Sequence, residues 1–320
     1  MITKYKSPLW ILSARRPREM PSYVVSAIIP ANLLNIPMVI FLENFDPAQT
    51  IKKFSPDVII VSKMLHNGVV DLIKEAKKSN IKVISIFDDW FVDKNITYKH
   101  HHINLEASKL NDVSVVKTSE AAKVLKDNLG INSQVIPDYL RFDKTIGDLH
   151  FKDPIKISWF GMYTNFDTLL FGIKQIVESN IACELNIISS KLSFLQKDIA
   201  AFNKTKVSIK LIEWTEEMDK EVIKSDVVII PLIDDAWRKV KSSNRIIDAI
   251  NLGRFVVISN VSQFKEFEEF CYMGHIGEGL RWVQNNKQTA KDIVLKGQKY
   301  VEEKYGKEKI TELWKNVIYN

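Results

Sequence analysis

The segment Ser225–Ser259 most constrains what this chain can fold into. It begins with Asp226–Leu232, a short run rich in Val and Ile that is typical of a strand covered on both faces. A helical pattern follows and ends at Gly253, a residue that commonly terminates helices. Phe255–Ile258 then reads as a second buried strand. The residues able to cap the helix at its start are Ser242, Ser243 and Asn244.

The same alternation of strands and helices runs through the whole sequence, with few hairpin signals. Such alternation predicts parallel sheets connected by crossover helices, which is an α/β fold. A chain of 320 residues is long enough for two domains of about 150 residues each. Because Arg141–Pro154 is polar and lacks periodicity, we expect domains at residues 1–150 and 151–320.

Composition narrows the class of protein. The chain is 46% hydrophobic and 26% charged, as expected for a soluble globular protein. The net charge of +6 comes without a long basic run, which argues against a nucleic-acid partner and leaves an anionic membrane surface or a nucleotide phosphate open.

The cysteines and the N-terminus bear on location. Cys183 and Cys271 lie far apart without metal-ligand spacing, which predicts reduced thiols in the cytoplasm. The N-terminus lacks a signal-peptide pattern, and no apolar run is long enough to span a membrane. We therefore expect a cytoplasmic protein, with peripheral contact with the inner face of the membrane left open.

Three cations crowd the start of the helix in the Ser225–Ser259 segment: Lys239, Lys241 and Arg245. The start of a helix already carries partial positive charge, so each surface cation there costs about 0.3–1 kcal/mol. A bound anion reverses that sign, and the free N–H groups of a helix start can hold a phosphate. The cluster therefore indicates a phosphate site, with solvated side chains as the alternative.

Loops that follow strands are the other candidate binding elements, since open parallel sheets bind ligands beyond the C-terminal ends of their strands. Gly161 leaves room for a ligand to approach the backbone, and Thr164 and Asn165 can cap a helix and donate to phosphate. Trp214 could stack on a base. The alternatives are an ordinary turn glycine and a packing tryptophan.

Four sequence blocks in this order carry a resemblance to a known family: ISWFG, LIEW, SDVVIIPL and KSSNRIIDAINLGRFVVIS. They resemble the C-terminal domain of GT-B glycosyltransferases, most closely the large retaining group of bacterial transferases for cell-surface glycans. The resemblance covers about Ile155–Ser259, and the first domain matches in architecture alone. It implies two Rossmann-like domains that face each other across a cleft, with the terminal helix packing back on the first domain.

The resemblance also implies roles for individual residues. The nucleotide diphosphate would be held by Gly161 and by the helix start at residues 242–244, and Asp248 would hold the ribose hydroxyls. The loop with Trp214 corresponds to the loop that contacts the base. A family glutamate that contacts the sugar is replaced here by Lys241, which departs from the two-glutamate pattern.

Further candidates lie in the first domain. Asp88 and Asp89 follow a predicted strand and could orient a hydroxyl or act as a general base, or could cap a turn in solvent. Arg15, Arg16 and Arg18 follow the first strand and could meet an acceptor phosphate, or form a basic surface loop.

Two local patterns are set aside. The histidines at positions 100–102 point in different directions and lack a further ligand at metal spacing, so we expect a polar loop and no metal site. The glycine pattern Gly274–Gly279 does not follow a strand in a βαβ unit, so we expect a loop there.

The resemblance implies a metal-independent glycosyltransferase that uses a nucleotide-sugar as co-substrate and needs no other cofactor. The acceptor would be a glycan, a lipid-linked molecule or a protein in surface polysaccharide or glycoconjugate assembly. Lys239, Lys241 or Arg245 would stabilise the negative charge that develops on the leaving diphosphate. A nucleotide-sugar epimerase of the same architecture and a non-catalytic nucleotide-sugar binding protein remain as alternatives.

Overall fold

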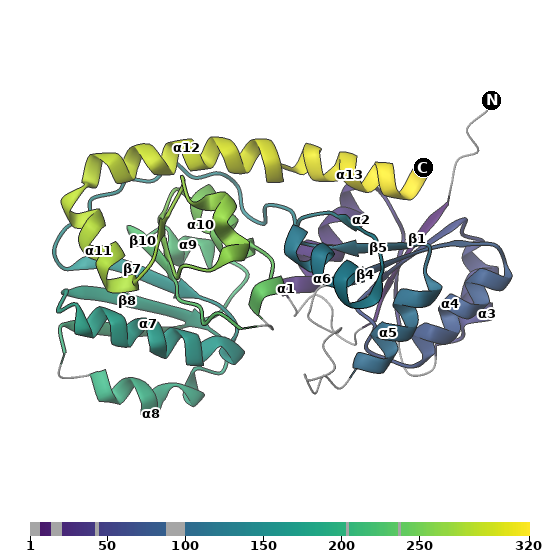
Figure 1. Cartoon of the computed structure of the whole chain (residues 1–320), viewed down its shortest axis with the longest axis horizontal. Coiled ribbons are helices and arrows are strands. Elements are labelled where there is room, and N and C mark those ends of the chain that lie inside the picture. Colours follow the sequence, from purple (N-terminus) through teal and green to yellow (C-terminus); the bar gives the residue numbers. More distant parts are fainter. Residues whose placement is uncertain (1–6, 14–20, 42–44, 88–99, 203–204, 236–237) are drawn as a thin grey trace. The chain divides into compact units, whose positions relative to one another are not determined.

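The computed structural model describes residues 7–13, 21–41, 45–87, 100–202, 205–235 and 238–320. Its internal contacts divide the chain into two units, and each unit is an α/β domain (Figure 1). The first unit comprises Met1–Tyr139, Val240–Ser242 and Tyr305–Asn320, and the second comprises Leu140–Lys239 and Ser243–Lys304. The predicted α/β fold class with two Rossmann-like domains is confirmed. By contacts, the change of unit falls at Leu140, earlier in the chain than the expected boundary at residue 150.

In the first unit, the described residues form one sheet of six parallel strands in the order β2-β1-β3-β4-β5-β6. The central strand β3 is buried along its whole length, as its VIIVS sequence requires. The strands are β1 (Pro8–Leu12), β2 (Met38–Ile40), β3 (Val58–Ser62), β4 (Lys82–Phe87), β5 (Val113–Val116) and β6 (Ser133–Val135).

Helices cover both faces of this sheet (Figure 1). A π-helical stretch over Val24–Ile28 precedes Pro30, which lies in the first turn of α2, where a missing N–H is tolerated. Helix α3 was not anticipated; Asp46 caps it by accepting from the Gln49 N–H. The helices are α1 (Pro21–Tyr23), α2 (Ile29–Leu33), α3 (Pro47–Phe54), α4 (Gly68–Lys78), α5 (His101–Leu110), α6 (Ser119–Leu129) and α13 (Lys307–Tyr319).

Helix α13 belongs to the core of the first unit although it lies far along the chain. Ile310, Trp314 and Ile318 are buried among residues of the sheet and of α1 and α2. The rings of Trp314 and Trp10 lie 5.0 Å apart. The N-terminal sheet therefore depends on a distant segment to complete one of its faces.

The second unit also contains a sheet of six parallel strands, in the order β12-β11-β10-β7-β8-β9. The chain starts at β7 in the middle, winds outward through β8 and β9, and then returns to wind the other way through β10, β11 and β12. This is the doubly wound order of a Rossmann-like domain. The strands are β7 (Ile155–Phe160), β8 (Cys183–Ser189), β9 (Val207–Glu213), β10 (Val227–Ile230), β11 (Phe255–Ile258) and β12 (Tyr272–Met273).

Helices flank this second sheet, and α7 and α8 are drawn below β8 in Figure 1. Residues 192–202 form three short pieces, with one α-helical turn between two 3₁₀ turns. The helices are α7 (Phe166–Glu178), α8 (Gln196–Ile199), α9 (Asp219–Val222), α10 (Asn244–Asn251), α11 (Ile276–Asn285) and α12 (Lys287–Tyr305).

The expected loop at Gly274–Gly279 is wrong, because α11 starts inside it at Ile276. The physical reason is close packing. A Cβ on Gly277 would lie 2.0 Å from the Ser179 Oγ, and a Cβ on Gly279 would lie 2.4 Å from a Val257 methyl. These glycines let a helix approach its neighbours closely, so they do not mark a turn.

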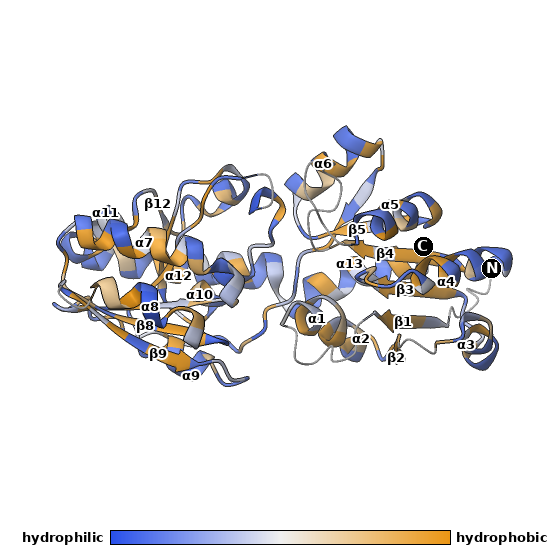
Figure 2. Ribbon diagram, turned by 90° about the horizontal axis from the view of Figure 1, so that it is seen from below, coloured by the Kyte–Doolittle hydropathy of each residue, from blue (hydrophilic) through white to orange (hydrophobic). Residues whose placement is uncertain are grey.

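Figure 2 shows that apolar residues concentrate in the strands of both sheets, while the helices alternate between apolar and polar faces. Among the helices that the structure describes, none is both long and apolar enough to cross a bilayer.

Candidate functional site

The fold of the second unit points to one place for a ligand. Strand order reverses between β7 and β10, which pair directly with each other. In doubly wound sheets the loops that leave the two strands at such a switch point diverge and form a crevice at their C-terminal ends. Here those loops are the one that starts at Gly161 and the one that leads from β10 into α10.

Gly161 and Arg245 meet at this switch point. A Cβ placed on Gly161 would lie 3.5 Å from the Arg245 Nη1, and 2.9 Å from Cζ2 of the Trp159 ring. A side chain at position 161 would therefore press on the Trp159 ring, while its Cβ would lie in van der Waals contact with the guanidinium. The predicted glycine loop and one of the three predicted cations are thus brought together.

The guanidinium of Arg245 is in an unusual electrostatic position. Its Nη1 is buried and has no hydrogen-bond partner among the described residues. Burial, and secondarily the charge of Arg238, lowers the pKa of Arg245 from 12.5 to about 10. A buried cation without a counter-charge is costly, and an anion at this position would remove that cost.

Four buried polar side-chain atoms lack a hydrogen-bond partner in the described part of the second unit. Trp159 Nε1 and Arg245 Nη1 belong to the residues that meet at Gly161. Arg141 Nε belongs to a side chain bound to Asp248 of α10. Gln263 Oε1 belongs to a side chain that donates to the Arg238 carbonyl. Since buried polar groups in native proteins are normally satisfied, the two donors that meet at Gly161 indicate a polar ligand at this place.

The start of helix α10 adds further donors. Ser243 is its N-cap residue, is buried, and makes no side-chain capping bond. The first N–H groups of a helix have no partner within the helix and carry partial positive charge. Asn244, at the first helical position, is half-buried. Ser243, Asn244 and Arg245 thus lie together on one helix start, as predicted for a phosphate site.

The start of helix α7 lies on the glycine loop. Asn165 is its N-cap residue and makes no side-chain capping bond to the helix, while Thr164 is exposed. The loop itself is fixed from the neighbouring strand, since Ser189 Oγ donates to the Gly161 carbonyl. Their roles toward a phosphate stay predictions.

Asp248 and Trp214 belong to one side-chain cluster. Asp248 is buried and forms a 2.9 Å ion pair with Arg141. Arg141 also contacts the sulfur of Met218, to which the Trp214 indole donates. The cluster brings together the residues predicted for ribose and base, and adds Arg141, which sequence reasoning missed. Any ribose contact by Asp248 would have to share its carboxylate with Arg141.

Lys239, a second predicted cation, lies beside an acidic residue of its own loop. The Nζ of Lys239 lies 3.8 Å from Asp234, and its side chain is 43% exposed. Lys241 and Ser242 group with the first unit by their contacts. Instead, Arg238 of the same loop is the cation whose charge reaches Arg245, and it pairs with Asp167 and Asp235. Roles for Lys239, Lys241 and Ser242 toward a ligand stay predictions.

The predicted acceptor and catalytic residues of the first unit, Arg15, Arg16, Arg18, Asp88 and Asp89, lie outside the described residues. Strand order in that unit reverses between β1 and β3.

The histidine run is partly helical, since α5 begins at His101. His102 Nε2 lies 3.1 Å from the Asn67 side-chain oxygen. Within the described parts of the chain, no group of three or more His, Cys, Asp and Glu residues is arranged to hold a metal ion.

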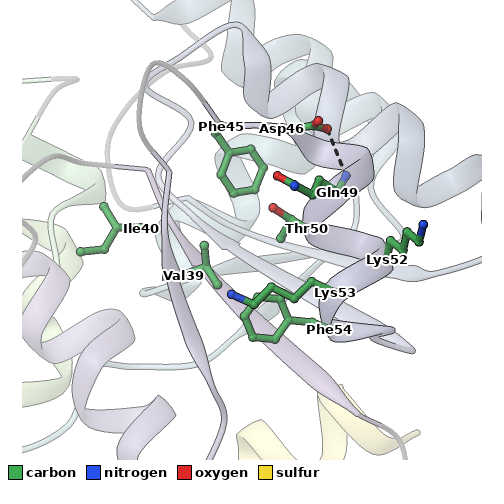
Figure 3. A pocket seen from close by; sticks show the side chains of 9 residues that line it. All are labelled: Val39, Ile40, Phe45, Asp46, Gln49, Thr50, Lys52, Lys53 and Phe54. Carbon is green, nitrogen blue, oxygen red and sulfur yellow. Dashed lines mark hydrogen bonds between the residues drawn. The ribbon is translucent and has the colours of Figure 1, made fainter.

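The first unit has a surface hollow of about 840 Å³ between β2 and α3. Figure 3 shows Val39 of β2 and Phe45, Gln49 and Thr50 near the start of α3 around it, while Lys53 lies beside the Phe54 ring. None of the residues predicted to bind the donor or the acceptor lines this hollow.

Comparison with known proteins gives structural neighbours alone. No protein-family model and no curated protein sequence matches the chain. HepE from Anabaena, solved with UDP, matches with a TM-score of 0.71 at 10% identity, over 97% of this chain and 99% of HepE. TarM from S. aureus, solved with UDP and α-GlcNAc-glycerol, matches with a TM-score of 0.66 at 14% identity and covers 86% of this chain. The chain spans 58% of the length of TarM.

A UDP-GlcNAc 2-epimerase from Neisseria meningitidis, solved with UDP-GlcNAc, also matches. Its TM-score is 0.56 at 12% identity, over 98% of this chain and 100% of the epimerase. Identities this low establish the architecture alone. The chain therefore has a GT-B glycosyltransferase-like fold, built from two Rossmann-like domains.

Proposed function

We propose that this protein is a glycosyltransferase that moves a sugar from a nucleotide-sugar to a glycan, lipid-linked or protein acceptor. The observation that carries the proposal is that two residues with unsatisfied buried donors, Trp159 Nε1 and Arg245 Nη1, meet at Gly161, at the switch point of a Rossmann-like sheet. The oxygens of a nucleoside diphosphate would satisfy such donors. HepE and TarM, which share the fold, were solved with UDP, which makes a UDP-sugar the first donor to test.

In this proposal the second unit stabilises the departing diphosphate. Negative charge grows on the diphosphate as the bond to the sugar breaks, and donors fixed beforehand lower the energy of that state. Arg245 and the first N–H groups of α10 would stabilise this charge, and Gly161 would leave room for the phosphate to approach them. Asp248 and Trp214 would hold the ribose and the base. No metal ion has a role in this proposal.

The first unit would bind the acceptor, with Arg15, Arg16 and Arg18 facing an acceptor phosphate and Asp88 or Asp89 orienting a hydroxyl. Participation in surface polysaccharide assembly, a cytoplasmic location and peripheral membrane contact belong to the same proposal.

An epimerase is the second candidate, because a UDP-GlcNAc 2-epimerase shares the architecture over nearly the whole chain. The two reactions differ in their need for an acceptor. An epimerase converts its nucleotide-sugar when no acceptor is present, whereas a transferase releases nucleoside diphosphate at a rate that rises with acceptor concentration.

Two measurements test the proposal. Thermal shift with UDP, GDP, ADP, TDP and CMP should raise the melting temperature for one diphosphate and less for its monophosphate and nucleoside. NMR of the corresponding nucleotide-sugars, with and without candidate acceptors, should then detect acceptor-dependent transfer. No binding of any nucleotide would refute the assignment of the site. Binding without turnover would favour a nucleotide-sugar binding protein, and turnover without acceptor would favour an epimerase.

A further inference from the structure

A second cluster of exposed side chains lies on the loops that follow β7 and β8, two strands that pair with each other. Tyr163 and Phe194 meet edge to face, with ring centroids 5.9 Å apart. The ammonium group of Lys191 lies 4.2 Å from the Tyr163 ring centre and 5.9 Å from that of Phe194. We name Tyr163, Lys191 and Phe194 the aromatic platform.

The platform is unusual for a surface. Phe194 is 63% exposed, and Met162 beside Tyr163 is 46% exposed. A soluble domain usually hides such large apolar groups, and those that stay exposed together often mark a binding surface. Tyr163, by contrast, packs against the core of the second unit, so the platform has a fixed base.

The backbone of the platform is also unusual. Lys191 adopts a left-handed conformation, with φ of 54°, which lysine rarely takes. This conformation starts the 3₁₀ turn over Leu192–Phe194 and places the ammonium group above both rings. Among the described residues, Lys191 contacts the two rings and forms no ion pair with a carboxylate. Lys191 therefore has an unfavourable backbone conformation at the position where its ammonium group lies beside exposed aromatic rings.

The chemistry of the platform selects a ligand with two features. An exposed aromatic ring favours a flat apolar surface, such as the C–H face of a pyranose ring. An ammonium group without a counter-charge favours an anion at the edge of that surface. A sugar ring that carries a carboxylate offers both features within one residue.

We propose that the aromatic platform binds an acidic saccharide, with the sugar ring stacked on Phe194 and its carboxylate bound by Lys191. This goes beyond the proposed function, because it assigns a glycan-binding surface that operates without a nucleotide. The proposed contacts come from Phe194 and Lys191, and neither Gly161 nor the guanidinium of Arg245 takes part.

Saturation-transfer NMR titration with tetragalacturonate and with maltotetraose tests the proposal, because these oligosaccharides match in length and differ in charge. The wild-type protein, free of nucleotide, should bind tetragalacturonate about threefold more tightly, as expected for one exposed charge pair. Phe194→Ala should weaken binding of both saccharides about tenfold. Lys191→Gln should remove the preference for the acidic saccharide and leave maltotetraose binding unchanged.

Two exposed residues of the same unit supply matched controls. Phe171→Ala on α7 and Lys197→Gln on α8 should leave both affinities unchanged. The melting temperature and UDP binding of every variant should equal those of the wild type, which separates this proposal from the proposed function. Equal binding of the two saccharides by the wild type, or an unchanged affinity in Phe194→Ala, would overturn the proposal.

Discussion

Replacing Arg245 with methionine should change stability and binding in opposite directions. The guanidinium Nη1 is buried without a hydrogen-bond partner, and burial lowers the pKa of Arg245 from 12.5 to about 10. A drop of that size corresponds to roughly 3 kcal/mol of cost for the charged form. Because solvent reaches part of the side chain, we expect Arg245→Met to raise the free energy of unfolding by about 1–2 kcal/mol at neutral pH.

The same substitution should weaken binding of a nucleoside diphosphate. A hydrogen bond to a charged group contributes about 1.5–3 kcal/mol, so the dissociation constant of UDP should rise roughly 10- to 150-fold. The affinity for uridine should stay unchanged, because the nucleoside lacks the phosphates. Calorimetry with UDP, UMP and uridine measures the dissociation constants. Urea unfolding of the wild type and of Arg245→Met without ligand measures the free energies of unfolding.

The stability difference should also depend on pH. Since the folded state holds the Arg245 proton less tightly than the unfolded state does, the cost of the buried charge is present at neutral pH. It should fade as pH rises from about 10 toward 12.5. The stability difference between Arg245→Met and wild type should therefore shrink in that window.

Lys174→Met on the exposed face of α7 is the control, and it should change neither the free energy of unfolding nor the dissociation constant of UDP. Loss of stability in Arg245→Met, or an equal loss of affinity for UDP and uridine, would refute the reasoning.

Three further predictions follow from packing and burial. Gly161→Ala should lower the free energy of unfolding by about 1–3 kcal/mol and weaken UDP binding, because its new methyl group would lie 2.9 Å from the Trp159 ring. An unchanged free energy of unfolding and an unchanged UDP affinity would show that the Trp159 ring moves to make room. Trp314→Ala should lower the free energy of unfolding, measured with urea, by about 3–5 kcal/mol. The control Leu295→Ala, at an exposed position on α12, should leave it nearly unchanged. Burial raises the pKa of both Cys183 and Cys271 to about 12. Ellman's reagent at pH 8 should therefore label neither thiol until urea unfolds the protein. Prompt labelling of the folded protein would contradict this prediction.

The sequence predicted the repeating units well where local signals agree. In the Ser225–Ser259 segment, β10, α10 and β11 form where the apolar runs and caps place them. Gly253 adopts the positive φ that a helix stop of this kind requires. Buried strands and capped helices are encoded within a few residues of each other, which is why a single sequence suffices for them.

The candidate site was predicted less completely, because its geometry depends on side chains that meet across the sheet. Arg245 was one of three cations that looked alike in sequence, and the structure brings it against Gly161. Trp159 carried no signal beyond that of a strand residue, although its unsatisfied indole N–H marks the same place. Arg141 precedes its partner Asp248 by about a hundred residues, and no local pattern links them.

Helix α13 has a consequence for how the protein is made. The N-terminal unit needs Ile310, Trp314 and Ile318 to complete one face of its sheet, yet these side chains are synthesised after the entire second unit. During translation, the apolar surface around Trp10 therefore stays exposed until α13 has been synthesised, which is after the whole second unit. Nascent chains of this protein should need chaperone protection until residue 318 emerges, and premature termination before that point should leave an N-terminal unit prone to aggregation.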